Sequence, residues 1–268
     1  MTSELQAVSE SSTLPPFVDV IAHRGYSAGA PENTLLAFEQ AIALGARSIE
    51  LDLQWTKDDI PVVTHDPSLG RTIAGTGKIA DLTWSELQEC DAGSWFNPEF
   101  SDQRVPSFEQ VLQRLDRLPG QLFLDLKPYC QWSAARVALL LDLLERYRWR
   151  DRSVACSFNP DIADCFNSNL LHPMAIGYSL TSAESFYELL PRAMTAGASI
   201  ICAYDILLAD PDLIWEAHAA GLEIVAWTVD QLDEIQQLSD FGVDRVITNC
   251  LLPKSPLLAH RTHTSATH

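Results

Sequence analysis

Four charged side chains occupy alternate positions in two apolar runs of the chain. Glu50 and Asp52 alternate with leucines, and so do Asp125 and Lys127. Side chains two positions apart in a β-strand share a face. All four charged groups then point to one side of their strands, and the leucines point to the other. We expect the leucine side to pack on helices and the charged side to line a site.

Three carboxylates in one confined site repel one another unless positive charge compensates them. Lys127 supplies one such charge, and Arg24, which follows another apolar run, supplies a second. A divalent cation would leave the site with one net positive charge, which a single bound phosphodiester anion would neutralise. Carboxylate oxygens are the ligands that Mg²⁺ and Ca²⁺ prefer. The alternative is a salt-bridge network that contains no metal.

Two histidines, His23 and His65, end apolar runs of the sequence. A histidine at the end of a strand is often a structural residue held by hydrogen bonds. Two of them beside a carboxylate cluster can instead supply a general base and a general acid, because the unperturbed pKa of imidazole lies near neutrality. Taken by themselves, these two residues leave both interpretations open.

The elements that position these residues alternate between strands and helices, which favours parallel βαβ units. Helices are expected over amphipathic stretches, the first of them capped by Asn33 or Thr34. The predicted strands are 18–23, 48–54, 61–65, 121–127, 153–157, 175–178, 199–203, 223–228 and 244–248. The predicted helices are 33–44, 107–118, 132–147, 160–167, 182–195, 211–220 and 231–239, and residues 83–90 are a further helix-like piece.

A closed α/β barrel has eight strands, one fewer than these candidates. Residues 55–60 are too few for a parallel crossover, so 61–65 is expected to fold back on the preceding strand as a hairpin arm. We therefore predict an α/β protein, a TIM-type (β/α)8 barrel with a hairpin arm and a small insertion after the second barrel strand. Such barrels place their active sites at the carboxyl ends of the strands, where the charged residues lie.

The 268 residues match the ~250 residues of one such barrel. We expect a single catalytic domain over residues 17–250, with the insertion at about 66–106. Residues 1–16 are expected to be a disordered leader, and residues 251–268 a C-terminal tail.

The chain carries 18 Lys and Arg against 36 Asp and Glu, a formal net charge of −18. Such a charge repels nucleic acids and anionic membrane surfaces. The sequence contains no apolar run long enough to span a membrane, no recognisable signal peptide and no C-x-x-C pair. We expect a cytoplasmic protein that binds no nucleic acid and associates with no membrane stably, and we leave the oligomeric state open.

Taken in chain order, these residues form an ordered set that resembles the glycerophosphodiester phosphodiesterase family. The segments that carry the resemblance are His23-Arg24-Gly25, Pro31-Glu32-Asn33-Thr34, Glu50-Leu51-Asp52, His65-Asp66 and Asp125-Leu126-Lys127. Further segments resemble the bacterial cytosolic branch, namely Arg71-Thr72, Gly75-Thr76-Gly77, Asp81-Leu82-Thr83, Ala92-Gly93-Ser94-Trp95-Phe96, Ser157-Phe158 and Trp227-Thr228-Val229. The ordered set is specific for this family, although each segment alone would be weak evidence of the resemblance.

The resemblance implies a metal-dependent hydrolase of glycerophosphodiesters, such as glycerophosphocholine or glycerophosphoethanolamine. Its products would be sn-glycerol 3-phosphate and an alcohol. The resemblance implies His23 and His65 as the acid–base pair. It also implies one divalent cation, Mg²⁺ or Ca²⁺, bound by Glu50, Asp52 and Asp125.

The resemblance further implies that Arg24 and Lys127 contact the phosphate. Glu32, Phe158 and Trp227 are candidates for the substrate pocket, and a core role is the alternative for the two aromatic residues. Two other enzymatic or binding functions stay open. One is a lysophospholipase D-type phosphodiesterase, and the other is a catalytically impaired barrel that only binds phosphodiesters.

The chain departs from the family pattern at two places. Asp125 stands where the family usually has Glu, and its shorter side chain is expected to reach the ion through a bridging water. Asp244 to Asn249 read Asp-Arg-Val-Ile-Thr-Asn where members commonly read Asp-Gly-x-x-Thr-Asp. We expect this second change to be peripheral to catalysis.

Overall fold

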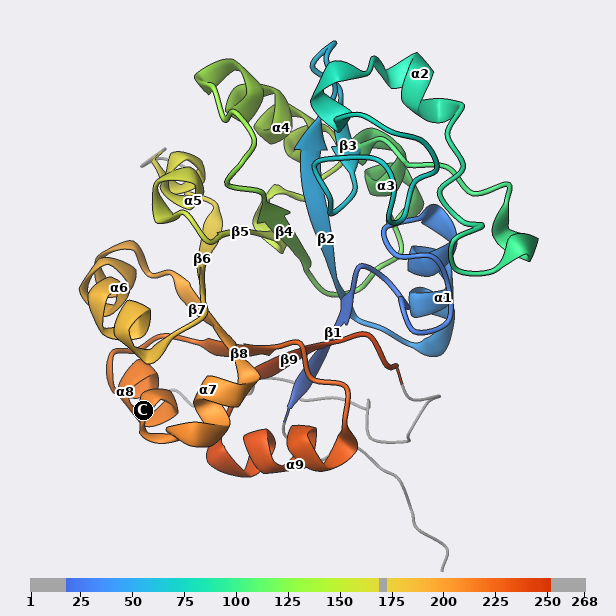
Figure 1. Cartoon of the computed structure of the whole chain (residues 1–268). Helices are drawn as coiled ribbons and strands as arrows, with labels where there is room; N and C mark the ends of the chain where they lie inside the picture. Colours follow the sequence, from blue (N-terminus) through green and yellow to red (C-terminus); the bar gives the residue numbers. More distant parts are fainter. Residues whose placement is uncertain (1–17, 169–172, 252–268) are drawn as a thin grey trace, which may run out of the picture.

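Eight parallel strands form the centre of the molecule, and helices surround them (Figure 1). The computed structural model describes residues 18–168 and 173–251. The eight strands are β1 (Asp19–His23), β2 (Ser48–Trp55), β4 (Leu122–Leu126), β5 (Ser153–Ser157), β6 (Ala175–Leu180), β7 (Ser199–Ala203), β8 (Ile224–Trp227) and β9 (Arg245–Thr248).

The sheet closes because β1 pairs with β9 on one side and with β2 on the other. Around the ring the order is β1, β9, β8, β7, β6, β5, β4 and β2. The register between β2 and β4 sets Asp52 beside Asp125. This closed ring confirms the predicted TIM-type (β/α)8 barrel.

A short ninth strand, β3 (Pro61–Val63), pairs antiparallel with β2, where Leu53 lies opposite Val63. Asp59 adopts a left-handed backbone (φ 60°) in the tight turn between the two strands. The hairpin arm is therefore confirmed. The strand ends two residues earlier than expected, so His65 lies in the loop that follows it.

The helices cover the outside of the barrel. They are α1 (Leu35–Leu44), α2 (Trp84–Gln88), α3 (Phe108–Arg114), α4 (Ala134–Arg146), α5 (Pro160–Asn167), α6 (Ala183–Ala196), α7 (Tyr204–Ala209), α8 (Asp212–Ala219) and α9 (Leu232–Phe241), with 3₁₀ turns η1 (Ile79–Asp81), η2 (Pro98–Phe100) and η3 (Arg150–Arg152). The sequence did not predict α7. None of the described helices has the length and hydropathy needed to cross a membrane.

Strand alternation separates two apolar layers. Leu51, Leu53 and Leu124 belong to the large cluster that the strands form with the outer helices. Inside the barrel, Ile21, Phe123 and other side chains form a smaller cluster. Glu50, Asp52 and Asp125 alternate with these leucines on their strands, and Lys127 directly follows β4. Glu50, Asp52 and Lys127 are buried, and Asp125 is partly buried.

The segment 66–106 follows the hairpin and contains η1, α2 and η2. Val62, Ile79 and Val105 are among the buried residues of a separate apolar cluster that fixes this segment to the hairpin arm. The predicted leader 1–16 lies outside the described residues, and so does the predicted tail 251–268 except for its first residue.

Candidate active site

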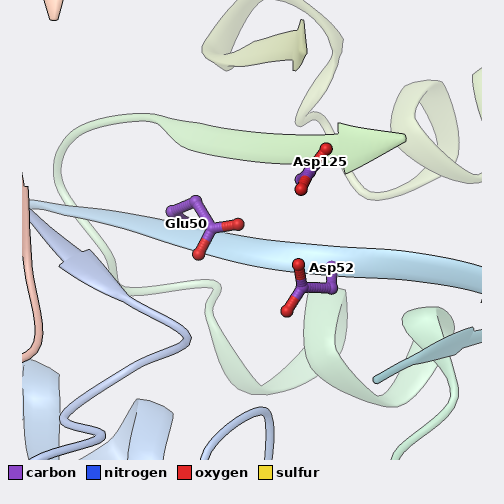
Figure 2. A group of neighbouring side chains, drawn as sticks. All are labelled: Glu50, Asp52 and Asp125. Carbon is purple, nitrogen blue, oxygen red and sulfur yellow. The ribbon is translucent and has the colours of Figure 1, made fainter. Parts of the chain in front are cut away.

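Three carboxylates meet near the carboxyl ends of two neighbouring strands. Glu50 and Asp52 extend from β2, and Asp125 extends from β4 toward them (Figure 2). One oxygen from each carboxylate lies within 4.8 Å of the other two. The sequence-predicted ligand set is therefore brought together as one cluster.

Two cations lie against this cluster. Lys127 Nζ is 2.5 Å from Asp52 Oδ1 and 2.5 Å from Asp125 Oδ2. Arg24 Nε is 3.2 Å from Asp52 Oδ2. Burial by itself would raise the pKa of Asp52, but Lys127 and Arg24 outweigh burial and hold that pKa below its usual range. Burial and the negative charge of Asp52 raise the pKa of Glu50 well above its usual value. The two cations therefore outweigh burial at Asp52 but not at Glu50.

The turn after β1 brings Arg24 to the cluster. Arg24 (φ 55°) and Gly25 (φ 81°) both adopt left-handed backbone conformations, which cost a non-glycine residue free energy. A Cβ on Gly25 would lie 2.7 Å from the carbonyl carbon of Ala37, so only glycine fits there. The turn also lets the Arg24 backbone N–H donate to Glu50 Oε2 at 3.1 Å.

Glu32 and Asn33 hold two of these charged groups in place. Arg24 Nη1 donates to Glu32 Oε1 at 2.7 Å. Asn33 Nδ2 donates to Asp52 Oδ2 at 2.6 Å. Thr34 is the residue that caps α1, because its hydroxyl oxygen accepts a backbone N–H of the first helical turn. The Asn33 side chain is thus free to orient the carboxylate of Asp52.

His23 lies at the end of β1 with 15% of its side chain exposed. Its Nδ1 is 2.7 Å from Asn249 Oδ1, and its Nε2 is 3.9 Å from Glu50 Oε2. Burial and the positive charge of Arg24 lower the pKa of His23 to about 4. This environment favours the neutral form of the His23 imidazole.

His65 has a different surrounding on the hairpin arm, where 36% of its side chain is exposed. Its Nδ1 is 2.7 Å from Asp66 Oδ1. Arg71 Nε donates to Asp66 Oδ2 at 2.5 Å, and Arg71 also donates to both oxygens of Glu32. Burial would raise the pKa of Asp66, but the bonds from Arg71 and His65 lower it below the usual range. An ionised carboxylate therefore stands behind His65.

One cavity of about 240 Å³ opens at this end of the barrel. Phe158 and Trp227 meet edge to face on its wall, with ring centroids 5.4 Å apart. Glu32 and Asp52 do not line the cavity, but both contact Arg24, which does. The predicted site residues that do line it are His23, Arg24, Glu50, His65, Asp125, Lys127, Phe158 and Trp227.

A sequence profile of the glycerophosphoryl diester phosphodiesterase family matches residues 23–251. The chain belongs to this family. It is therefore a phosphoric diester hydrolase of the glycerophosphodiester phosphodiesterase type, and the match covers every residue of the site described above.

Individual relatives agree with the family assignment. The Bacillus subtilis protein YhdW is 34% identical over 235 residues, which cover 86% of this chain and 93% of the relative. The glycerophosphodiester phosphodiesterase of Caldanaerobacter subterraneus is 29% identical over 245 residues, with 86% and 93% covered. A solved phosphodiesterase of Oleispira antarctica, in complex with sn-glycerol-3-phosphate, superimposes with a TM-score of 0.78 at 28% identity. That alignment covers 88% of this chain and 93% of the other.

The carboxylate cluster of this family member fits a hard divalent cation. Its donors are carboxylate oxygens, which such ions prefer. Asp125 Oδ1 is buried and accepts no hydrogen bond from any described residue, so an acceptor is left over at the cluster. A cation between the carboxylates would also offset the burial and the repulsion by Asp52 that together raise the pKa of Glu50. The metal-free salt bridges of Lys127 do form, but they leave these two features unexplained.

Sequence reasoning missed three side chains that contact the predicted residues of this family member. Asn33 was considered only as a helix cap, and Asp66 was noted without a role. Asn249 was expected to be peripheral to catalysis; in the structure its amide oxygen contacts His23, one of the predicted site residues. The adjacency of Asp66 to His65 was a usable signal. The contact of Asn249 was not visible in the sequence, because 226 positions separate it from His23.

Proposed function

We propose that this family member hydrolyses glycerophosphodiesters to sn-glycerol 3-phosphate and an alcohol, with His23 and His65 as its acid–base pair. The observation that carries the proposal is one cavity lined by both imidazoles, by the carboxylates of Glu50 and Asp125, and by the two cations. The Oleispira antarctica relative was solved with sn-glycerol-3-phosphate, which supports a small-molecule substrate of this kind.

The two imidazoles suit a displacement at phosphorus. The attacking hydroxyl belongs to water, or to the glycerol moiety, in which case water opens the resulting cyclic phosphate in a second step of the same kind. One imidazole takes the proton of this hydroxyl as the new P–O bond forms. The bond from phosphorus to the leaving oxygen breaks, and the second imidazole, protonated beforehand, gives its proton to that oxygen. The ring protons then exchange with solvent, which restores the starting states of His23 and His65.

We infer that Glu50, Asp52 and Asp125 hold one divalent cation, Mg²⁺ or Ca²⁺. When bound, such an ion stabilises the negative charge that develops on the nonbridging phosphate oxygens. One oxygen of each carboxylate lies within 4.8 Å of the other two, so the three side chains are close enough together to hold one such ion.

Arg24 and Lys127 are proposed to bind the phosphate, because both line the cavity beside the carboxylates. Glu32 fixes the Arg24 guanidinium through its 2.7 Å bond and so acts on the substrate only indirectly. Phe158 and Trp227 offer apolar faces on which the carbon atoms of the substrate can pack.

We propose residues 17–250 as one catalytic domain, since the barrel and its insertion share the site: Arg71 of the insertion bonds Asp66 and Glu32. A cytoplasmic location is also a proposal. Its support is that all six cysteines are free thiols, as is usual in a reducing compartment.

The experiment is a substrate panel with controlled metal content. Glycerophosphocholine, glycerophosphoethanolamine and lysophosphatidylcholine would each be incubated with Mg²⁺, Ca²⁺, Mn²⁺ or a chelator, and release of the alcohol would be measured. We expect sn-glycerol 3-phosphate from the two soluble diesters, an ion-dependent rate and loss of activity under chelation. Faster turnover of the lysolipid would favour the lysophospholipase D-type alternative. Binding of the diesters without any product would favour the impaired barrel.

A further inference from the structure

The ring of His23 is held by a hydrogen-bond chain that the proposed function does not use. Asp230 follows β8, and Asn249 follows β9. Asp230 accepts from the Asn249 backbone N–H at 2.8 Å and from Asn249 Nδ2 at 2.7 Å. It also accepts from the Thr248 hydroxyl at 3.0 Å. The Asn249 side chain is therefore fixed from the side opposite His23.

The chemistry of these groups determines which atom of the amide faces His23. An ionised carboxylate only accepts hydrogen bonds, and the three donors around Asp230 match that state. The NH₂ group of Asn249 must then face Asp230, which leaves its carbonyl oxygen, Oδ1, to face the ring. Ser27 Oγ lies 2.7 Å from the same oxygen and 2.8 Å from the His23 carbonyl oxygen, so its one proton is shared between these two acceptors and does not decide the orientation.

An amide oxygen has no proton to give, so the ring nitrogen facing it must carry one. That nitrogen is His23 Nδ1, 2.7 Å away. In a neutral imidazole a proton on one nitrogen leaves a lone pair on the other. The lone pair is then on Nε2, at the cavity wall 3.9 Å from Glu50 Oε2.

We propose that Asp230 and Asn249 are positioning residues that keep His23 in its Nδ1–H tautomer, so that Nε2 is the proton acceptor of the reaction. The inference rests on the proposed function, because it selects His23 to take the proton of the attacking hydroxyl. That proton moves to Nε2, the hydroxyl oxygen bonds to phosphorus, and the departing alcohol oxygen is left to take its proton from His65.

The direct test is the tautomer of His23 in the full-length wild-type protein. Protein labelled with ¹⁵N-histidine would be examined by two-bond ¹⁵N–¹H correlation at pH 8, where an ordinary imidazole is neutral. The His23 signals are those absent from the His23→Gln variant. The inference predicts the Nδ1–H pattern, both with Mg²⁺ and without it. An Nε2–H pattern, a mixture of tautomers or a protonated ring would overturn it.

A variant separates positioning from simple packing. Asn249→Leu removes the acceptor at similar volume, so the His23 signals should shift toward a tautomer mixture. Its kcat should fall by ~10-fold or more, as expected for a misplaced tautomer, while KM changes less than about twofold. Cys250→Ser, on the exposed neighbouring side chain, is the control and should match wild type in both measurements. An unchanged tautomer or an unchanged kcat in Asn249→Leu would contradict the inference.

Failure of this inference and failure of the proposed function give different results. The spectrum of the wild-type protein reports the tautomer whether or not any diester is hydrolysed. If the protein hydrolyses the diesters while its His23 ring is in the Nε2–H form, the proposed function stands and the positioning role of Asp230 and Asn249 is rejected. An Nδ1–H ring in a protein that releases no sn-glycerol 3-phosphate would remove the function, and with it the catalytic part of the inference.

Discussion

His23 and His65 line the same cavity, but the groups behind their rings differ in charge. A neutral amide, that of Asn249, contacts His23, which is mostly buried. An ionised carboxylate, that of Asp66, contacts His65, which is more exposed and is tied by Arg71 to the insertion. A neutral acceptor behind a buried ring suits a base, whereas a carboxylate behind a ring suits an acid that must carry a proton. We propose on this ground that His23 acts as the base and His65 as the acid.

Removal of either imidazole is the change with the largest expected effect on kcat. His23→Ala and His65→Ala should each lower kcat by ~10²-fold or more, the usual scale of acid–base catalysis. His218→Ala is a matched control, because His218 Nε2 also lies 3.0 Å from a carboxylate, Asp244, but does not line the cavity. Thermal unfolding should show that all three variants fold. Wild-type turnover in either of the first two would remove that histidine from the mechanism.

The acidic cluster tests whether the two histidines can work without an ion. Glu50→Gln and Asp52→Asn each remove one negative charge from the cluster, so the apparent affinity for the activating cation should fall by ~10-fold or more. Activity titrated with Mg²⁺ or Ca²⁺ measures this affinity. Glu184→Gln, an exposed change on α6, is the control. Full activity of wild type after exhaustive chelation would favour a metal-free salt-bridge network.

The negative charge of the Asp66 carboxylate behind His65 can be tested separately from the imidazole. Asp66→Asn keeps an acceptor for the ring but removes its charge, so we expect kcat to fall by about tenfold, less than for loss of the imidazole itself. Asp142→Asn, which removes an exposed carboxylate of an ion pair on α4, should have no effect. Steady-state kinetics at saturating cation would decide. If Asp66→Asn retained full kcat, the charge behind His65 would have no catalytic role.

The smallest expected effect is at Asp125. Asp125→Glu lengthens the side chain by one methylene and should replace the proposed bridging water, so that activity persists and cation affinity rises a few-fold. Asp125→Asn should weaken binding, because it removes a charge. Calorimetric titration with Mg²⁺ measures both variants. Loss of cation binding in a folded Asp125→Glu protein would show that the pocket requires the shorter side chain.

The parts of this fold that could be predicted depend on local pattern. Leucine alternation around Glu50 and Asp125 predicted which side chains would meet, and the short link at 55–60 predicted the hairpin. Helix α7 was missed because its first turn has no side-chain cap, which removes the usual start signal from the sequence. Its six residues are also too few for a helical period to be recognised.

The unpredicted part of the site comes from loops that meet only in the closed barrel. Asp52 is oriented by Asn33, and His23 by Asn249, in contacts that no local pattern encodes. The last strand must pair with the first before Asn249 can reach His23. Whether Asn249 lies beside His23 could therefore be judged only once the closure of the barrel was known.

Leaving-group dependence tests the assignment of roles most directly. The substrate would be a glycerophosphodiester whose alcohol is p-nitrophenol, compared with glycerophosphocholine. Nitrophenolate departs without protonation, so an enzyme that lacks only its general acid should recover most of its rate on this substrate. We predict that His65→Ala recovers most of its rate on the nitrophenyl substrate and that His23→Ala recovers none. Recovery in His23→Ala with none in His65→Ala would contradict the assignment and reverse the roles of the two histidines.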